Sequence, residues 1–600
     1  MSERAQYVVG IDLGTTNSVV AFAALGEREP RVTLLPLEQL VTPGGVEHDN
    51  CLPSFLYVLS TEQRSSPAFH LPGEETAAFV VGELARRLGV DVPERLVSSA
   101  KSWLSVPQAD RTSAFLPWGA SDAVDKVSPV EASARYLERV VRSWNARFPQ
   151  APCAEQEIVL TVPASFDPAA RQLTLQAAEA AGLSDVTLLE EPQAAFYAWL
   201  QQQGRAWRDK LALGDWILVC DIGGGTTDFS AIQVSEHEGD LTLERIAVGD
   251  HILLGGDNMD LALAEVLREQ LAIQGTRLDA WQFRSLVQAC REAKEQLLSS
   301  GEGADSVPVA IAGRGSRLIG GTVRADLTRA LAEQVIVEGF FPRVDLSDSP
   351  VGRTPVLLEE WGLPYAADPA VTRHLASFVR QAQSARGRAS GAVPSAVLFN
   401  GGVFHASLLR ERLLSLLADW FSVDRPPEVL LGTDLRQAVA QGAAFYGWAR
   451  LHGGVRIRAD LPHSYYVGVA AALPAVPGRR PPLRALCVAP RGLAEGSEVE
   501  LPEREFALHL GHELEFRLFR SQRPDAVGTL VEEMDDAFEV LPPVRVHLGE
   551  RTEGGRVPVR LRARLNELGV LELWCHERGG QRRWRLEFDL RATQAASPVR

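Results

Sequence analysis

The sequence predicts an α/β protein with two related lobes, followed by a smaller antiparallel β domain. Residues 7–22, YVVGIDLGTTNSVVAF, and residues 216–231, WILVCDIGGGTTDFSA, share one order of features. Each has an apolar run, an Asp, a Gly-rich turn, paired threonines and a second β-rich run. Short runs of Val and Ile around a Gly-bearing turn are typical of hairpins. Because the pattern occurs twice, it indicates two related lobes.

Strands and helices alternate between the two hairpins, which favours an α/β lobe over an all-helical one. Asp167 and Pro168 have the character of an N-cap and a first helical residue. In chain order the pattern predicts a strand at 158–162, a helix at 168–181, a strand ending at Leu189, a helix after Pro192, and amphipathic helices at 257–271 and 281–298.

From about residue 455 short alternating segments are separated by Gly, Pro and Asn, which predicts an antiparallel β domain. The clearest segments are 515–519, 544–548, 557–561 and 584–588. Prolines and small residues predict a surface insertion at 340–394. The expected boundaries are a first unit at 1–452, followed by a linker at 453–460, the β domain at 461–592 and a loose tail at 593–600. Within the first unit we expect a first lobe at 1–214, a second lobe at 215–435 and a return helix at 436–452.

Composition narrows the class of protein. The 600 residues have a formal net charge of −16, which argues against nucleic-acid or anionic-membrane binding, because clustered Lys and Arg supply phosphate affinity. The start, MSERAQYVVGID, lacks the features of a signal peptide, and no apolar run approaches the roughly 18 residues that span a bilayer. The six cysteines show no CxxC pair or metal-ligand spacing, which predicts reduced, mostly buried thiols. We therefore expect a cytoplasmic protein.

The two Gly-rich turns can bring backbone amides close to phosphate oxygens, because glycine has no Cβ and tolerates positive φ. Asp12 and Asp221 stand where a strand should end, and carboxylates there can hold the waters of a hydrated Mg²⁺. Hydroxyl groups that can bond phosphate follow at Thr15, Thr16, Thr226 and Thr227. A single turn of this kind is more often only a tight hairpin. Turn chemistry does not explain why the same pattern occurs twice, so the pair favours a polyphosphate clamp.

A third element, AVLFNGGVFHASLLRERL at 396–413, should run from a strand through Gly401 and Gly402 into a helix. Paired glycines before a helix N-terminus leave room for a flat ring or an anion. Taken alone, such an element is more often a structural turn. The sequence contains no GxxxxGK[ST] loop, so phosphate binding would depend on the two hairpins.

With these three elements in this order, the sequence resembles the heat-shock protein 70 (DnaK-type) chaperones of the actin-like ATPase superfamily. GIDLGTTNS and DIGGGTTDF match the family's two phosphate loops. Further matches are LPSF at 52–55, Ala100-Lys101, TVPASFDPAARQ at 161–172, EEPQAA at 190–195, LGGDNMD at 254–260 and QAVAQGAA at 437–444. The resemblance covers about the first 450 residues and implies a two-lobed, duplicated ribonuclease-H-like ATPase domain, with a β-sandwich domain after it.

The resemblance implies a set of site residues for ATP or ADP with Mg²⁺ and K⁺. Asp12, Asp221 and Asp228 would organise the metal ions. Lys101, Glu191 and Thr226 would join Asp12 and Asp221 in slow ATP hydrolysis. Phosphate would be bound by Gly14, Thr15, Thr16, Asn17, Gly223, Gly224, Gly225, Thr226, Thr227, Gly255 and Gly256. Pro163 and Arg171 match the residues that relay nucleotide state to the second domain; without the resemblance Pro163 would be an ordinary strand terminator.

Several positions depart from the family pattern. The expected adenosine-binding residues are Arg291, Lys294, Glu295, Leu298, Gly401, Gly402 and His405, of which Lys294 alone keeps the family residue type in the adenosine helix, while His405 replaces an arginine. Thr187 stands where the family has the arginine that docks J-domain co-chaperones, and VRIRADL at 455–461 replaces a Leu-rich acidic linker. These changes argue against adenine stacking between guanidinium groups and against ordinary J-domain coupling.

The resemblance implies an ATP-dependent chaperone-like protein. Residues 461–592 would bind unfolded polypeptide or a dedicated partner, and a nucleotide-exchange factor is a further expected partner. The segment after the β domain is too short for the family's helical lid, which implies a lidless member. Two alternatives stay open: a nucleotide-gated scaffold with negligible hydrolysis, and a small-molecule kinase of the same superfamily. The kinase is the less favoured, because it needs a base for the acceptor hydroxyl and has no use for a β domain.

Overall fold

The chain consists of two compact units, Met1–Ile457 and Arg458–Arg600. The computed structural model describes residues 5–74, 76–106, 109–237, 240–250, 252–298, 304–311, 322–352, 362–386, 393–432, 434–454, 457–458, 461, 463–470, 483–494, 496–501, 504–511, 513–532, 534–535, 537–547, 556–566, 570–580 and 582–589. The tail expected at 593–600 lies outside these residues, and so do positions 455, 456, 459 and 460 of the expected linker.

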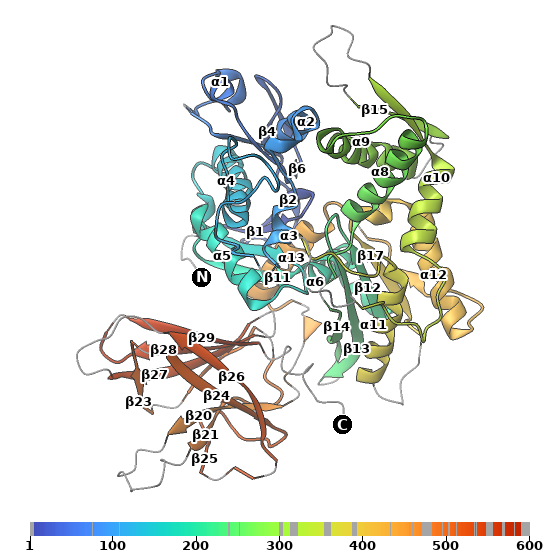
Figure 1. The fold of residues 1–600 in the computed structure, drawn as a ribbon. Helices are drawn as coiled ribbons and strands as arrows, with labels where there is room; N and C mark the ends of the chain where they lie inside the picture. Colours follow the sequence, from blue (N-terminus) through green and yellow to red (C-terminus); the bar gives the residue numbers. More distant parts are fainter. Residues whose placement is uncertain are drawn as a thin grey trace, which may run out of the picture. The chain divides into compact units, whose positions relative to one another are not determined.

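The first unit contains two six-stranded sheets, and a predicted hairpin forms the middle of each (Figure 1). One sheet has the order β11-β10-β1-β2-β3 with β6 beside β2, its strands being β1 Tyr7–Leu13, β2 Asn17–Ala24, β3 Thr33–Leu34, β6 Cys51–Pro53, β10 Glu157–Val162 and β11 Val186–Glu190. The other has the order β18-β17-β12-β13-β14-β19, its strands being β12 Trp216–Ile222, β13 Thr227–His237, β14 Asp240–Val248, β17 Ala396–Asn400, β18 Glu428–Val429 and β19 Ile457–Arg458.

The same pairing pattern surrounds both hairpins. Strand β1 is antiparallel to β2 and parallel to β10, while β12 is antiparallel to β13 and parallel to β17. Asp12 and Asp221 therefore occupy equivalent positions, each one residue before its strand ends. The repeat seen in the sequence is confirmed as a repeat in strand pairing.

The predicted helices are present, with ends shifted by one or two residues. Asp167 caps α5 (Pro168–Ala180) by accepting a hydrogen bond from the Ala170 amide at 2.6 Å. Helix α6 (Glu191–Gln203) begins before Pro192 rather than after it. A proline is tolerated there because amides of the first helical turn have no partner within the helix. None of the helices in the described part of the chain is long and apolar enough to cross a membrane.

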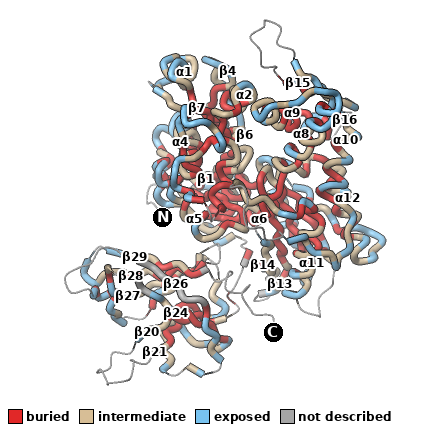
Figure 2. The backbone as a smooth tube through the Cα atoms, viewed as in Figure 1, coloured by how far each residue is buried: buried red, intermediate tan, exposed pale blue. Residues whose placement is uncertain are grey.

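Helix α13 (Ala438–His452) packs against the first sheet and against α6. Glycines permit this close approach. A Cβ on Gly442 would lie 1.7 Å from the Ala194 carbonyl oxygen, and one on Gly10 would lie 2.3 Å from the Ala444 nitrogen. Figure 2 shows the buried backbone concentrated in these central elements. The helix that carries Glu191 is thus fixed from behind by backbone contact.

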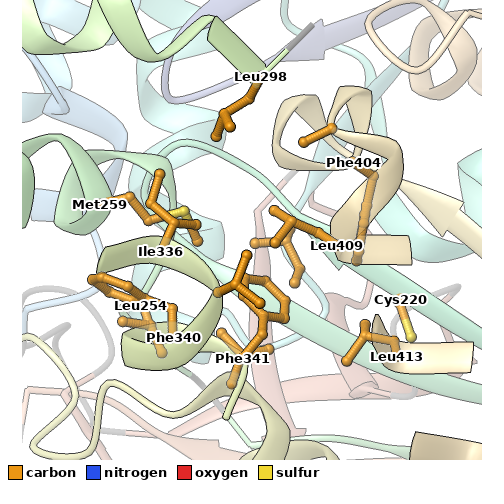
Figure 3. Close-up of a cluster of buried hydrophobic side chains, with 14 of the residues drawn as sticks. Cys220, Leu254, Met259, Leu298, Ile336, Phe340, Phe341, Phe404, Leu409 and Leu413 are labelled. Atoms are coloured by element: carbon orange, nitrogen blue, oxygen red, sulfur yellow. The ribbon is translucent and has the colours of Figure 1, made fainter. Parts of the chain in front are cut away.

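The sequence predicts a surface insertion at 340–394, and this prediction is wrong for residues 371–386. These residues form α11 (Val371–Arg386), which packs on β13 and β14. Its Leu375 and Phe378 are buried in the core of the second sheet. A helix with one apolar face buries that face, and the small residues near its end concealed the pattern. The same core includes the residues labelled in Figure 3, among them Phe340, Phe341 and Leu298.

The second unit contains two five-stranded antiparallel sheets. Their inward side chains form one hydrophobic cluster that includes Tyr465, Leu486, Leu573 and Phe588. The strands are β20 Ser464–Ala470, β21 Leu483–Ala489, β24 Glu513–Ser521, β25 Leu530–Val531 and β26 Glu539–His547 in one sheet, and β22 Glu498–Glu500, β23 Phe506–His509, β27 Arg556–Leu565, β28 Val570–Glu577 and β29 Arg583–Asp589 in the other. Antiparallel β structure is present where the alternating segments predicted it.

Candidate functional site

A cleft of about 840 Å³ in the first unit is lined by both hairpin turns and by the third predicted element. The predicted site residues that line it are Asp12, Gly14, Thr15, Thr16, Asn17, Glu191, Asp221, Gly223, Gly224, Thr226, Gly256, Arg291, Lys294, Glu295, Leu298, Gly401, Gly402 and His405. Arg86 of α2 (Glu83–Asp91) also lines the cleft and pairs with Glu292 of α9 (Ala280–Leu298) at 3.6 Å.

The two turns have the same internal hydrogen bond. In the first, the Gly14 amide donates to the Asn17 carbonyl at 3.1 Å, and in the second the Gly223 amide donates to the Thr226 carbonyl at 3.0 Å. Each bond closes a four-residue turn between antiparallel strands. The paired sequence motifs therefore fold into paired local structures.

The turns face one another across the cleft. A Cβ on Gly224 would lie 2.0 Å from the Thr16 hydroxyl oxygen, and one on Gly225 would lie 2.5 Å from the Ser102 hydroxyl oxygen. Because glycine has no Cβ, the second turn can approach these two hydroxyl groups closely. A small anion with several oxygens that entered the cleft beside them could contact both turns.

Buried carboxylates gather beneath the turns. Burial, with Glu191 adding to the effect, raises the pKa of Asp12 and of Asp228 to about 7. Burial, Glu191 and Asp228 raise the pKa of Asp221 well above its usual value. So many acids in one buried place are costly to ionise without a cation.

Neighbouring polar groups fix two of these carboxylates. The Thr161 hydroxyl donates to Asp12 at 3.2 Å, and the Asn400 amide donates to Asp221 at 3.0 Å. Asn400 is the last residue of β17, so the third element contributes to the acidic cluster as well as to the cleft wall. Sequence reasoning missed both residues, although each lies within a quoted motif.

Lys101 does not line the cleft but pairs with Glu191, which does. Both side chains are largely buried, at 6% and 14% exposure. The adjacent Glu190 is fully buried and pairs with Arg245 of β14 at 2.8 Å. This second ion pair joins the two sheets directly behind Glu191. The sequence does not predict a role for Arg245, because this residue lies in a strand outside all of the matched motifs.

Three predicted phosphate contacts lie away from the cleft lining. The Thr227 hydroxyl donates to the Leu254 carbonyl at 2.7 Å, and the residue is fully buried. Gly255 is the N-cap of α8 (Gly256–Ile273), and its amide donates to Asn258 at 2.9 Å. Both residues shape the second turn rather than face the cleft. Gly225 is likewise absent from the lining, and a Cβ on it would lie 2.5 Å from the Ser102 hydroxyl oxygen and 2.9 Å from the Thr15 methyl carbon.

The expected adenosine residues surround one end of the cleft, but Arg291 is engaged elsewhere. Its guanidinium donates to Asp257 at 2.5 Å and to Asp260 at 2.7 Å. Lys294 pairs with the same Asp260 at 2.6 Å. These bonds hold the guanidinium by its edges, and its carbon lies 5.7 Å from the centroid of the Phe55 ring. The adenosine contact expected of Arg291 stays a prediction. Among residues not predicted, Arg436 lines this end and lies 4.0 Å from Glu295.

The predicted relay residues lie outside the cleft lining. Pro163 follows β10 and is buried, and Arg171 is buried in α5. The third expected metal carboxylate, Asp228, also lies outside the lining, and it accepts a hydrogen bond from the Ser165 amide at 3.3 Å. Asp228 and the segment between the two relay residues are therefore in direct contact.

The buried carboxylates fit a hydrated cation better than a directly chelated one. Among the described residues, no group of three or more His, Cys, Asp or Glu side chains is placed to hold a metal ion directly. Mg²⁺ commonly keeps several waters and takes few protein ligands. Asp12 and Asp221 line the cleft where such waters would lie.

Comparison with known proteins gives one consistent family. The model of the family described as Hsp70 protein matches residues 76–344. The chain is 32% identical to the chaperone protein HscA of Citrobacter koseri over 315 residues, which is 51% of this chain and 44% of that protein. It is 30% identical to the chaperone protein DnaK of Thermotoga neapolitana over 341 residues, 56% of this chain and 48% of that protein. The chain thus spans just under half the length of the curated relatives it matches.

Proposed function

Since this chain belongs to the Hsp70 family, we propose that it is a chaperone-like ATPase that couples its nucleotide state to binding of polypeptide or a dedicated partner. The observation that supports this best is the meeting of two glycine turns above a buried acidic cluster. Its first unit would adopt the actin-like ATPase arrangement, and its second unit, Arg458–Arg600, would bind the partner. Free cysteines, five of them buried, suit a cytoplasmic location.

In this proposal the cleft positions a nucleotide for attack by water. Amides of the two turns would bind phosphate oxygens, with Thr16 and Thr226 adding hydroxyl donors. Mg²⁺, and K⁺ as a second cation, would supply charge neutralisation through waters held by Asp12, Asp221 and Asp228. Phosphoryl transfer depends mainly on positioning and electrostatic stabilisation, so the residues need form no covalent bond to the substrate.

The Lys101–Glu191 pair would act on the reacting groups. Lys101 would reach the terminal phosphate and the attacking water once Glu191 turns toward the metal's waters. The ion pair keeps both side chains ordered until then. The test is steady-state phosphate release from Mg-ATP by the full chain. Turnover that can be measured supports hydrolysis, whereas tight binding without turnover would favour the nucleotide-gated scaffold.

The acidic cluster predicts a pH-dependent stability that Mg²⁺ should alter. The folded pKa of Asp12 and of Asp228 is about 7, above the ordinary 3.8, so the folded state holds protons that the unfolded chain releases. Without metal, stability should therefore fall as the pH rises from about 4 to about 7 and then level off. Excess Mg²⁺ should raise the unfolding temperature more at about pH 8 than at about pH 5.

Differential scanning fluorimetry with and without Mg²⁺ measures both effects. Asp228→Asn removes one titrating group and is the matched variant, for which we expect a shallower pH dependence. A Mg²⁺ effect equal at all pH values would contradict a metal held over these carboxylates.

The expected adenosine-binding residues depart from the family pattern, which predicts weak discrimination between ATP and GTP. Because Asp257 and Asp260 fix Arg291 beside the Phe55 ring, at 5.7 Å from its centroid, we expect the guanidinium to adjust poorly to adenine and to add little stacking. We expect ATP and GTP affinities to agree within about tenfold, a difference of roughly 1.4 kcal/mol. Calorimetry of both nucleotides measures the ratio.

Arg436→Ala serves as the matched variant, since Arg436 is half exposed at this end. It should weaken both nucleotides by a similar small factor, because an exposed stacking contact contributes about 0.5–1 kcal/mol. Tight and adenine-selective binding would show that another group recognises the base.

Coupling between the units predicts that nucleotide state changes partner release. An extended peptide bound to the full chain should dissociate roughly 5- to 150-fold faster in one nucleotide than in the other, the range typical of allosteric coupling. Pro163→Gly should reduce that ratio, because Pro163 lies at the end of β10 beside the segment that contacts Asp228. Fluorescence anisotropy with ATP and with ADP measures release.

Pro149→Gly, an exposed turn proline, is the control and should leave the ratio unchanged. Equal release in both nucleotides would remove the support for coupling while leaving hydrolysis untouched.

A further inference from the structure

Ser99 has an unusual backbone for its residue type. Its φ of 53° and ψ of 30° lie in the left-handed region, where it is one of two non-glycine residues with positive φ in the described part of the chain. Non-glycine residues adopt this region at a steric cost, and such conformations persist where the surroundings enforce them. Ser99 immediately precedes α3 (Ala100–Trp103), the short helix that carries Lys101.

The hydroxyl of Ser99 does not cap its own helix. A serine at this position normally accepts a hydrogen bond from an amide of the first turn, but no such bond forms here. The hydroxyl instead donates to Asp257 at 2.7 Å, across 158 positions of sequence. The strained backbone therefore directs the side chain out of α3 and toward α8.

Asp257 joins α3 to the second glycine turn. Its carboxylate accepts from Ser99, and its backbone amide donates to the Gly224 carbonyl at 2.8 Å. The turn and α3 also approach one another directly, since a Cβ on Gly225 would lie 2.5 Å from the Ser102 hydroxyl. Asp257 thus sets the position of α3 relative to the turn that is proposed to bind phosphate.

Arg291 fixes the orientation of the Asp257 carboxylate. It donates to one oxygen of Asp257 while Ser99 donates to the other. Arg291 is itself anchored by Asp260, which is 1% exposed. Burial alone would lower the pKa of Arg291, but Asp257 and Asp260 raise it, so the guanidinium stays charged. Both carboxylate oxygens of Asp257 therefore have a donor, and rotation of the group would break one bond.

We propose that Ser99, Asp257 and Arg291 form a clasp whose function is to position α3, and with it Lys101, relative to the second glycine turn. In this clasp Asp257 is a positioning residue that acts through Ser99 and α3. The inference rests on the proposed function only in assigning Lys101 a role in hydrolysis.

The first test measures the position of α3 without any nucleotide. Hydrogen exchange of nucleotide-free full-length protein should be faster in Ser99→Ala at the amides of Leu104 and Ser105, which donate to Lys101 and Ser102. We expect an increase of roughly tenfold or more, because the lost bond is to a charged group. Ser235→Ala is the control, since Ser235 makes an exposed bond of the same kind to Glu244 at 3.0 Å.

The second test separates positioning from general structural support. Ser99→Ala should lower kcat for ATP by roughly tenfold with KM within about twofold, the pattern of a contact that matters in the transition state. Ser99→Asn should restore most of both properties, because asparagine tolerates the left-handed region and its amide can donate to Asp257.

The outcomes are distinct from failure of the proposed function. If the parent hydrolyses no ATP, the exchange measurement still decides whether the clasp holds α3. Unchanged exchange at Leu104 and Ser105 in Ser99→Ala would overturn the clasp. So would a Ser99→Asn protein that exchanges like Ser99→Ala. Faster exchange with rescue by asparagine supports it.

Discussion

Asp221→Asn should lower ATP turnover by about 100-fold or more while leaving the protein at least as stable as the parent. Removing one preorganised contact to the transition state costs roughly 2.7 kcal/mol or more. Asp221 is 6% exposed, one residue from the end of β12, and lines the cleft. The amide of asparagine keeps an acceptor for Asn400 but lacks the charge that would hold the metal's waters.

The free energy of unfolding should not fall in Asp221→Asn, because ionising the buried Asp221 carboxyl destabilises the metal-free folded protein. Burial, Glu191 and Asp228 raise the pKa of Asp221, so its ionised form is disfavoured in the metal-free protein. We expect an unchanged or higher unfolding temperature in Asp221→Asn without Mg²⁺. Parent-like stability combined with lost turnover would separate a catalytic role from a structural one.

The control for this experiment is Asp424→Asn, which changes an exposed carboxylate outside the cleft. It should preserve both turnover and unfolding temperature. If Asp221→Asn hydrolysed ATP at the parent rate, the assignment of the acidic cluster to Mg²⁺ and phosphate would be wrong. Thr226→Ala tests the adjoining turn in the same way and should also lower turnover.

Local patterns in the sequence account for much of the fold. The two hairpins could be predicted because strand, turn and strand are contiguous, and because Asp12 and Asp221 stand at the same place in both copies. The capped start of α5 at Asp167 was predictable for the same reason. Helix α6 begins one residue before Pro192, whereas the sequence predicts a start after it, because a proline fits in the first turn of a helix.

The supporting contacts of the site could not be predicted, because they join residues far apart in sequence. Arg245 pairs with Glu190 across 55 positions, and Ser99 bonds Asp257 across 158. Neither pair has a local pattern that distinguishes it from ordinary polar residues. The ion pairs of Arg291 with Asp257 and Asp260 also join two different helices, which the sequence alone does not bring together.

Gly442→Ala should be strongly destabilising and should also lower turnover. The added Cβ would lie 1.7 Å from the Ala194 carbonyl oxygen and 2.8 Å from the Ala198 amide nitrogen. Both atoms belong to the backbone of α6, so no side-chain rotation can relieve the overlap. Overpacking of this kind costs about 1–3 kcal/mol and sometimes more. Because no neighbouring side chain can rotate away, we expect the loss of stability in Gly442→Ala to lie at the upper end of this range.

The activity effect follows from what α6 carries. Glu191 is its first residue, so α6 cannot move away from α13 without displacing Glu191 from Lys101. A displacement of about 1 Å in a positioning group can cost roughly 100-fold in rate. Urea unfolding and steady-state turnover of the same preparation measure both consequences. We expect a lower midpoint and a turnover that remains low even where the variant is fully folded.

Two glycine variants distinguish this contact from a general effect of alanine. Gly339→Ala adds a Cβ where nothing lies within 4 Å, at a right-handed φ of −83°. It should be neutral or stabilising by up to about 1 kcal/mol. Gly447→Ala, also in α13, meets side-chain atoms of Val8 and Val159, which can adjust, so its loss should be smaller than that of Gly442→Ala. Equal stability of all three variants would show that α13 and α6 can separate freely, and Glu191 would then not depend on this backbone contact.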